Sequence, residues 1–118
     1  MLIVADSSPL HLLIEIGHAD VLPLLFGRVA IPTAVAAELS HAHAPTTVHV
    51  FMSHPPEWLE IRTPAHVEPI HELDPGERAA ISLAHELIAD FLLIDEKAGR
   101  RVAREHHLAV IGSLGVLE

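Results

Sequence analysis

The chain has 118 residues, half of them apolar, no cysteine and a formal charge of −9. That length suits a single domain, residues 1–118, and the lack of cysteine excludes a disulfide scaffold, a thiolate zinc site and a cysteine nucleophile. With only three Phe, one Trp and no Tyr, an aromatic platform for single-stranded nucleic acid is not expected, and the acidic balance argues against gripping phosphates by bulk charge.

Short apolar runs alternate with amphipathic segments along the chain. The apolar runs predict strands, the third of them a weak edge strand, at residues 2–5, 29–31, 58–62, 91–94 and 108–111. Helical spacing, often with Pro or a capping residue at its start, predicts helices at residues 9–17, 20–26, 32–40, 46–53, 75–89 and 97–107. Ile88 is expected on the apolar stripe of the fifth helix. This order predicts an α/β fold with a mostly parallel sheet.

The two ends of the sequence carry separate expectations. The opening residues lack the basic region of a signal peptide, and no apolar run approaches the roughly 18–20 residues of a membrane helix. We therefore expect a cytoplasmic protein that does not enter a membrane. Ser113 has the character of a helix cap five residues before the last residue, so the C-terminal helix is expected to be short or missing.

Four acidic residues fall where an α/β sheet forms its sites, outside the carboxyl ends of the strands. Asp6 and Asp95 directly follow predicted strands, Glu38 lies on the helix after the second strand, and Glu77 lies in the first turn of the helix before residues 91–94. Each also has a structural interpretation. The two aspartates suit caps for the helices that follow them, Glu77 fits a capping box with Asp74, and Glu38 suits a boundary position reaching water.

Taken together, the four carboxylates predict a cation site. Carboxylates that converge on one cleft repel each other and raise each other's pKa values, and a divalent cation removes that penalty. Oxygen ligands without cysteine favour Mg²⁺ or Mn²⁺. Such sites activate water and stabilise phosphoryl oxygens during phosphodiester cleavage.

Basic residues are concentrated on the helix that follows Asp95. Four of the seven in the chain occupy eight positions there: Lys97, Arg100, Arg101 and Arg104. Their spacing gathers them on one helical face. That face is either a phosphate-contacting stripe at the rim of an acidic cleft or an ordinary solvated surface.

Four motifs resemble those of PIN-domain proteins, in particular a poorly characterised prokaryotic group related to the VapC toxins. They are Asp-Ser-Ser-Pro-Leu at residues 6–10, Pro-x-x-Val-x-x-Glu-Leu at 32–39, Leu-x-x-Gly-Glu-x-x-Ala at 73–80, and Ala-Asp-Phe-Leu-Leu-Ile-Asp-Glu-Lys at 89–97. The closing Val-Ile-Gly-Ser-Leu-Gly-Val-Leu is also similar to that group. The resemblance therefore spans nearly the whole chain.

The resemblance implies a three-layer α/β/α sandwich and a Mg²⁺- or Mn²⁺-dependent ribonuclease. It maps the metal-binding and catalytic acids onto Asp6, Glu38, Glu77 and Asp95, with Glu96 assisting as a ligand. It also implies an RNA substrate, a homodimer and, in the toxin branch, a small antitoxin partner. The alternative hypothesis is a non-catalytic PIN-like module that binds a protein or assembles with itself.

Overall fold

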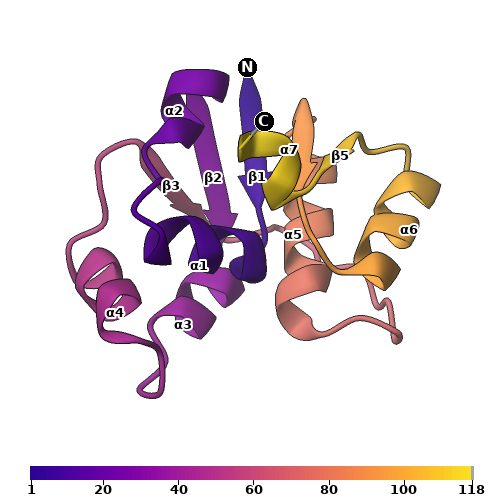
Figure 1. The fold of residues 1–118 in the computed structure, drawn as a ribbon. Coiled ribbons are helices and arrows are strands. Elements are labelled where there is room, and N and C mark those ends of the chain that lie inside the picture. Colours follow the sequence, from indigo (N-terminus) through magenta and orange to yellow (C-terminus); the bar gives the residue numbers. More distant parts are fainter. Residues whose placement is uncertain (118) are drawn as a thin grey trace.

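The fold is a five-stranded, all-parallel sheet covered by helices on both faces (Figure 1). It is seen in a computed structural model that describes residues 1–117. The strands, in the spatial order β3-β2-β1-β4-β5, are β1 (Leu2–Ala5), β2 (Arg28–Pro32), β3 (Leu59–Arg62), β4 (Phe91–Leu93) and β5 (Val110–Ile111). The helices are α1 (Ser7–Glu15), α2 (Val21–Phe26), α3 (Thr33–Leu39), α4 (Thr46–Ser53), α5 (Pro75–Glu86), α6 (Lys97–Glu105) and α7 (Ser113–Leu117).

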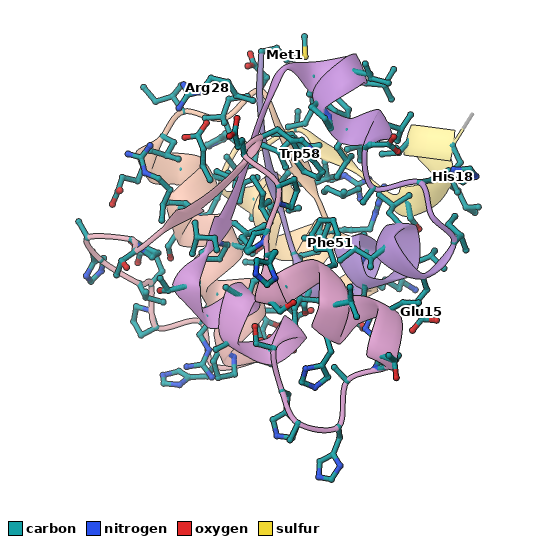
Figure 2. All side chains as sticks on the ribbon, turned by 90° about the vertical axis from the view of Figure 1, so that its left-hand side faces the viewer. Met1, Glu15, His18, Arg28, Phe51 and Trp58 are labelled. Atoms are coloured by element: carbon teal, nitrogen blue, oxygen red, sulfur yellow. The ribbon has the colours of Figure 1, made fainter. Side chains whose placement is uncertain are left out.

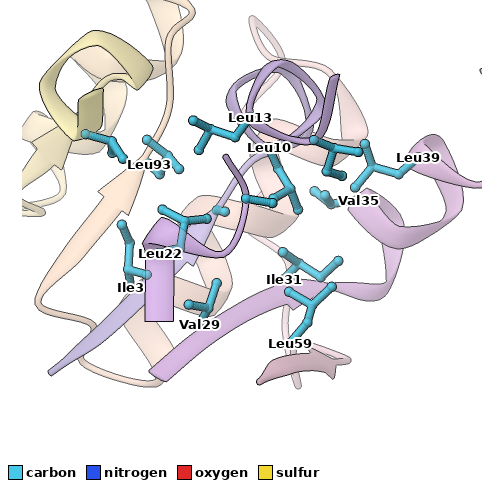
Figure 3. Packing of buried hydrophobic residues seen from close by; sticks show 14 of the residues in the cluster. Ile3, Leu10, Leu13, Leu22, Val29, Ile31, Val35, Leu39, Leu59 and Leu93 are labelled. Atoms are coloured by element: carbon cyan, nitrogen blue, oxygen red, sulfur yellow. The ribbon is translucent and has the colours of Figure 1, made fainter. Parts of the chain in front are cut away.

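The buried strands supply side chains to two hydrophobic clusters, one on each face of the sheet. Along β1, Ile3 and Ala5 join the cluster beneath α1, α2, α3, α4 and α7, whereas Leu2 and Val4 join the cluster beneath α5 and α6. Alternate residues of a strand point to opposite faces, so an uninterrupted apolar run fits a sheet covered on both sides. Figure 3 shows the first cluster between the sheet and its helices. The predicted three-layer α/β/α sandwich is confirmed.

The central position of β1 determines where the candidate site lies. β1 pairs with β2 on one side and with β4 on the other, with Ile3 opposite both Val29 and Phe91. Just past the end of β1, the backbone N–H of Asp6 donates to the carbonyl of Leu93 at 2.9 Å. Asp6 and the segment after β4 therefore meet at the carboxyl edge of the sheet.

The β3 edge is held by aromatic packing. Phe51 of α4 lies against Trp58, which precedes β3, with 6.1 Å between the ring centroids (Figure 2). Both rings are half-buried and pack against the first cluster. The weak pattern at residues 58–62 is thus a genuine edge strand, anchored through α4.

One predicted helix is shorter than its apolar pattern indicates. α5 ends at Glu86, and Ile88 is 86% exposed with a φ of 51°, so its expected place on the buried stripe is wrong. The backbone N–H of Ala89 instead bonds to the carbonyl of Ala84 at 2.9 Å, which closes the helix and turns Ile88 outward. α7 is short, as expected. Within residues 1–117, no helix is long and apolar enough to cross a membrane.

Candidate active site

Asp6 is the most deeply buried of the predicted site residues. It is 3% exposed, and its Oδ1 is buried without a hydrogen-bond partner among the described residues. It occupies the N-cap position of α1, yet its side chain makes no capping hydrogen bond, so the capping interpretation does not account for it. A buried oxygen without a donor is costly, so Oδ1 of Asp6 is an acceptor that the described residues leave unsatisfied.

The electrostatics of Asp6 reflect this position. Burial, together with smaller repulsion from Glu77, Asp74 and Glu38, raises the pKa of its carboxyl to about 7, against the opposing effect of the Ser7 backbone N–H. Three carboxylates from α3 and the start of α5 therefore act on Asp6. At neutral pH the group lies near its titration midpoint, and any cation bound there would favour its ionised form.

Glu38 of α3 is exposed and held by α1. The hydroxyl of Ser7 donates to its Oε2 at 2.7 Å, and the side chain lies against the start of α5. A Cβ built on Gly76 would fall 2.0 Å from Oε1 of Glu38. Gly76 therefore provides the space in which this carboxylate lies.

Glu77 combines two interpretations that the sequence left open. Its Oε1 accepts the backbone N–H of Asp74 at 3.0 Å, and Asp74 Oδ1 accepts the backbone N–H of Glu77 at 2.8 Å, so the predicted capping box is present. Its other oxygen, Oε2, faces α6, 3.4 Å from where a Cβ on Gly99 would lie. Glu77 is 7% exposed. Burial, followed by repulsion from Asp74 and Glu96, raises its pKa, whereas the backbone of Asp74 opposes the shift.

Asp95 caps a helix, though not the helix that follows it in sequence. Both of its oxygens accept hydrogen bonds from Ser113, Oδ1 from the backbone N–H and Oδ2 from the hydroxyl, each at 2.8 Å. Asp95 thus holds the start of α7, and Glu96 rather than Asp95 occupies the N-cap of α6, without a capping side-chain bond. The expectation that Asp95 caps α6 is corrected to α7.

Among the predicted acids, Asp6, Glu38 and Glu77 form one group, and Asp95 is not part of their electrostatic coupling. Asp6, Glu38 and Glu77 interact electrostatically, together with Asp74, and Glu96 acts on Glu77. No three His, Asp or Glu side chains of residues 1–117 are arranged to hold one ion as they stand. Glu38, Glu77 and Asp95 each accept hydrogen bonds within the protein, from Ser7, the Asp74 backbone and Ser113 respectively.

The basic face of α6 divides in two. Arg100 turns toward the end of β4 and donates from Nη1 to the carbonyl of Ile94 at 2.9 Å. Arg101 turns the other way and pairs with Glu72 at 2.6 Å and Glu105 at 2.9 Å, while Lys97 and Arg104 are exposed. The idea of one continuous phosphate-contacting stripe is therefore weakened for Arg101, whose guanidinium already binds two carboxylates.

Sequence reasoning did not find the glycines that shape this site. Gly76 makes room for Glu38, and Gly112 lies beside Asp95, where a Cβ would come within 3.0 Å of Oδ1. The only signal was the presence of Gly beside Glu77 and after the last strand. Such positions are otherwise explained as helix starts or turns.

The protein is an α/β/α sandwich with acidic residues at the carboxyl edge of its parallel sheet. Comparison with known proteins shows which family has this arrangement. The chain belongs to the PIN-domain family, whose sequence profile matches residues 2–118. Proteins of this family are generally nucleases. Among curated proteins, none matches the chain.

A solved structure shares the fold. It is a PilT N-terminus domain protein from the hyperthermophilic archaeon Sulfolobus solfataricus P2, with a TM-score of 0.69 and 19% sequence identity. The match covers 99% of this chain and 91% of the archaeal one. The likeness establishes a common architecture over almost the full length of both proteins.

Proposed function

We propose that this PIN domain is a Mg²⁺- or Mn²⁺-dependent ribonuclease whose catalytic centre comprises Asp6, Glu38, Glu77 and Asp95, with Glu96 assisting. The observation that carries the proposal is the Oδ1 atom of Asp6, buried at the carboxyl edge of the sheet without a donor among residues 1–117. Family membership supports nuclease chemistry in general. The choice of RNA rests on the resemblance to VapC-related PIN domains, and the choice of these cations rests on the carboxylates around Asp6.

The donor set suits a hard divalent cation. The carboxylates of Glu77 and Glu38 raise the pKa of Asp6 by repulsion, and a bound cation would convert that repulsion into attraction. Although Glu38, Glu77 and Asp95 each accept a hydrogen bond, a carboxylate has about four acceptor positions and retains capacity for a cation. When bound, the cation supplies Lewis-acid activation of water and of the phosphodiester.

Hydrogen bonds within the protein orient three of the proposed ligands, and the fourth, Asp6, changes its protonation near neutral pH. Ser7 orients Glu38 through its hydroxyl, and Ser113 fixes Asp95 through two hydrogen bonds. The capping box orients Glu77, so the rigid start of α5 determines where Oε2 lies. Asp6, with a pKa of about 7, must lose its proton near neutral pH before it can serve as a ligand. A cation and this proton therefore compete for Asp6, and we expect Mn²⁺ affinity to rise with pH through this range.

The proposal is tested by incubating the purified protein with a panel of defined RNAs and Mn²⁺ or Mg²⁺. The wild type is expected to cleave, whereas Asp6→Asn, which keeps the shape and removes the charge, is expected to be inactive. Asp20→Asn provides the control, because Asp20 is an exposed acid at the start of α2. Equal cleavage by wild type and Asp6→Asn would exclude this catalytic centre.

A second candidate function, a protein-interaction or self-assembly module, is favoured by one surface. A cavity of about 400 Å³ between α1 and α4 is lined by Ile14, Val50 and Phe51, among others, and Val50 is 65% exposed. Exposed apolar surface of this kind is typical of interfaces. A second copy of the chain or a small antitoxin are the partners that the family resemblance suggests.

This candidate is tested by sedimentation of the purified protein. If the surface mediates self-association, Val50→Asp should shift a dimer to monomer, whereas Ile88→Asp, at an exposed apolar position on another helix end, should not. If the wild type and the Ile88→Asp variant are both monomers at high protein concentration, self-assembly through this face is contradicted. The result is independent of nuclease activity.

A further inference from the structure

A second hollow opens beside the acidic group, at the β4–β5 edge. Its volume is about 560 Å³, within the range of small-ligand sites, and it is lined by Asp95, Arg100, Ile111, Gly112 and Leu114, among others. It lies between the start of α6 and the start of α7. Asp95 therefore belongs both to the proposed catalytic centre and to this cavity.

Arg100 is held in place at the wall of the cavity. Its Nη1 donates to the carbonyl of Ile94 at 2.9 Å, and it makes no ion pair with any acid among residues 1–117. A Cβ on Gly112 would fall 2.9 Å from Nη1 and 3.0 Å from Oδ1 of Asp95, so a side chain at that position would displace both groups. Because a guanidinium has five N–H donors, Arg100 retains donors for an anion.

Among the described residues that line the cavity, Arg100 is the one cation. Both oxygens of Asp95 already accept from Ser113, whose hydroxyl and backbone N–H are used in turn. Leu114 is 75% exposed and Ile111 is half-buried, so both present aliphatic surface. The cavity thus combines one anchored cation with an apolar wall, next to an acid of the catalytic centre.

We infer that this cavity is a subsite for a nucleotide flanking the scissile phosphate, an inference that rests on the proposed ribonuclease function. Arg100 binds the flanking phosphate through charge-assisted hydrogen bonds. The base packs against Leu114 and Ile111 rather than on an aromatic ring. Because base identity is read through hydrogen bonds to base edges and the base here packs on aliphatic side chains, the subsite accepts all four bases.

The inference is tested by equilibrium binding in EDTA, where no cleavage occurs. The probe is a fluorescein-labelled single-stranded RNA hexanucleotide, and its anisotropy is titrated with wild type, Arg100→Ala and Leu114→Ser at several KCl concentrations. Arg28→Ala is the matched control, because Arg28 is an exposed arginine at the opposite end of the sheet, paired with Glu60. Thermal unfolding of each variant establishes that it is folded.

Arg100→Ala is expected to weaken binding about tenfold and to lower the magnitude of the salt slope by about 0.7, the value for one phosphate of a single strand. Leu114→Ser, at an exposed position, should weaken binding of the normal probe but not of a probe with abasic nucleotides. Homopolymers of different bases should bind equally well. The inference is overturned if Arg100→Ala has the same affinity and salt slope as Arg28→Ala. It is also overturned if the protein strongly prefers one base at this position.

The outcomes separate this inference from the proposed reaction. If the protein fails to cleave RNA but binds the hexanucleotide in an Arg100-dependent way, the nuclease proposal fails and the cavity is a nucleotide-binding site without a scissile phosphate beside it. If the protein cleaves RNA and Arg100→Ala changes neither affinity nor salt slope, the nuclease stands and the subsite fails.

Discussion

Asp95 and Ser113, eighteen positions apart in sequence, are joined by two hydrogen bonds of 2.8 Å. The carboxylate that follows β4 thereby caps α7, which packs beside α1 on the first face of the sheet (Figure 1). A residue proposed as a cation ligand is thus fixed by the last described helix. The position of α7 and the geometry of the proposed site are consequently linked through a single side chain.

Replacing Ser113 with Ala should affect both stability and cation binding. The change removes the hydroxyl donor to Asp95 Oδ2 but keeps the backbone bond, so a loss of about 0.5–1.5 kcal/mol of unfolding free energy is expected. Mn²⁺ affinity should fall as Asp95 becomes less restrained. Urea unfolding and calorimetric Mn²⁺ titration measure the two effects. Ser53→Ala, which removes a hydroxyl bonded to Val50 on α4, should leave Mn²⁺ affinity unchanged.

Replacing Asp6 with Asn should stabilise the protein in a pH-dependent way. The folded-state pKa is raised to about 7 from an ordinary value of 3.8, so between these values the folded state holds a proton that the unfolded state has lost. The stability contributed by Asp6 therefore falls as pH rises through this window, and the full penalty applies above about pH 7. At that pH the Asn variant should be more stable, by up to about 4 kcal/mol.

The measurement is urea unfolding of wild type and Asp6→Asn at a series of pH values. The difference between them should be small near pH 4 and grow up to neutral pH. Addition of Mn²⁺ at about pH 8 should raise the melting temperature of the wild type alone. A stability difference that does not vary with pH would contradict the assignment of this titration to Asp6.

Glu77 allows its structural and chemical roles to be separated. Gln keeps the capping box because its side-chain carbonyl can accept the Asp74 N–H, and the pKa of Glu77 is raised. Glu77→Gln should therefore be at least as stable as the wild type at neutral pH, while losing activity. Glu77→Ala loses the cap and should cost about 1 kcal/mol as well. Thermal unfolding and RNA cleavage are compared for both variants. Full activity of the Gln variant would show that Glu77 serves only as a cap.

Gly76 should influence catalysis through Glu38. Gly76→Ala places a Cβ 2.0 Å from the present position of Oε1 of Glu38, so that flexible side chain must move while the helix itself tolerates Ala. We expect near-normal stability and a loss of activity of about 10–100-fold. Combining it with the shorter acid, Glu38→Asp, should restore part of the loss. If Gly76→Ala remains fully active, the position of Glu38 is not important for the reaction.

The fold could be predicted because its signals are local. Apolar runs such as residues 2–5 are buried on both faces, and the order of the elements leaves few alternatives to a parallel sheet. The capping box of Asp74 and Glu77 is likewise encoded within four residues and is present as expected. The resemblance to PIN domains, carried by four local motifs, is confirmed by the family profile.

The contacts that could not be predicted depend on tertiary structure. The partner of Asp95 comes from a segment eighteen residues away, and the sequence gives no reason to choose α7 over α6. The end of α5 was missed because Leu87 and Ile88 continue the apolar pattern without a Gly to mark the stop, although Ile88 adopts the left-handed conformation. The sequence leaves open whether Arg101 faces phosphate or solvent, and its pairing with Glu72, from a loop, depends on tertiary structure.

The most direct test of the central claim is a crystal structure of the protein grown with Mn²⁺, with anomalous diffraction to locate the ion. The account predicts an anomalous peak in contact with Oδ1 of Asp6 and with at least one further carboxylate of the group Glu38, Glu77 and Asp95. The peak should be missing from Asp6→Asn crystals. An ordered structure in which Asp6 Oδ1 contacts no ion at saturating Mn²⁺, or binds only a protein donor, would contradict it.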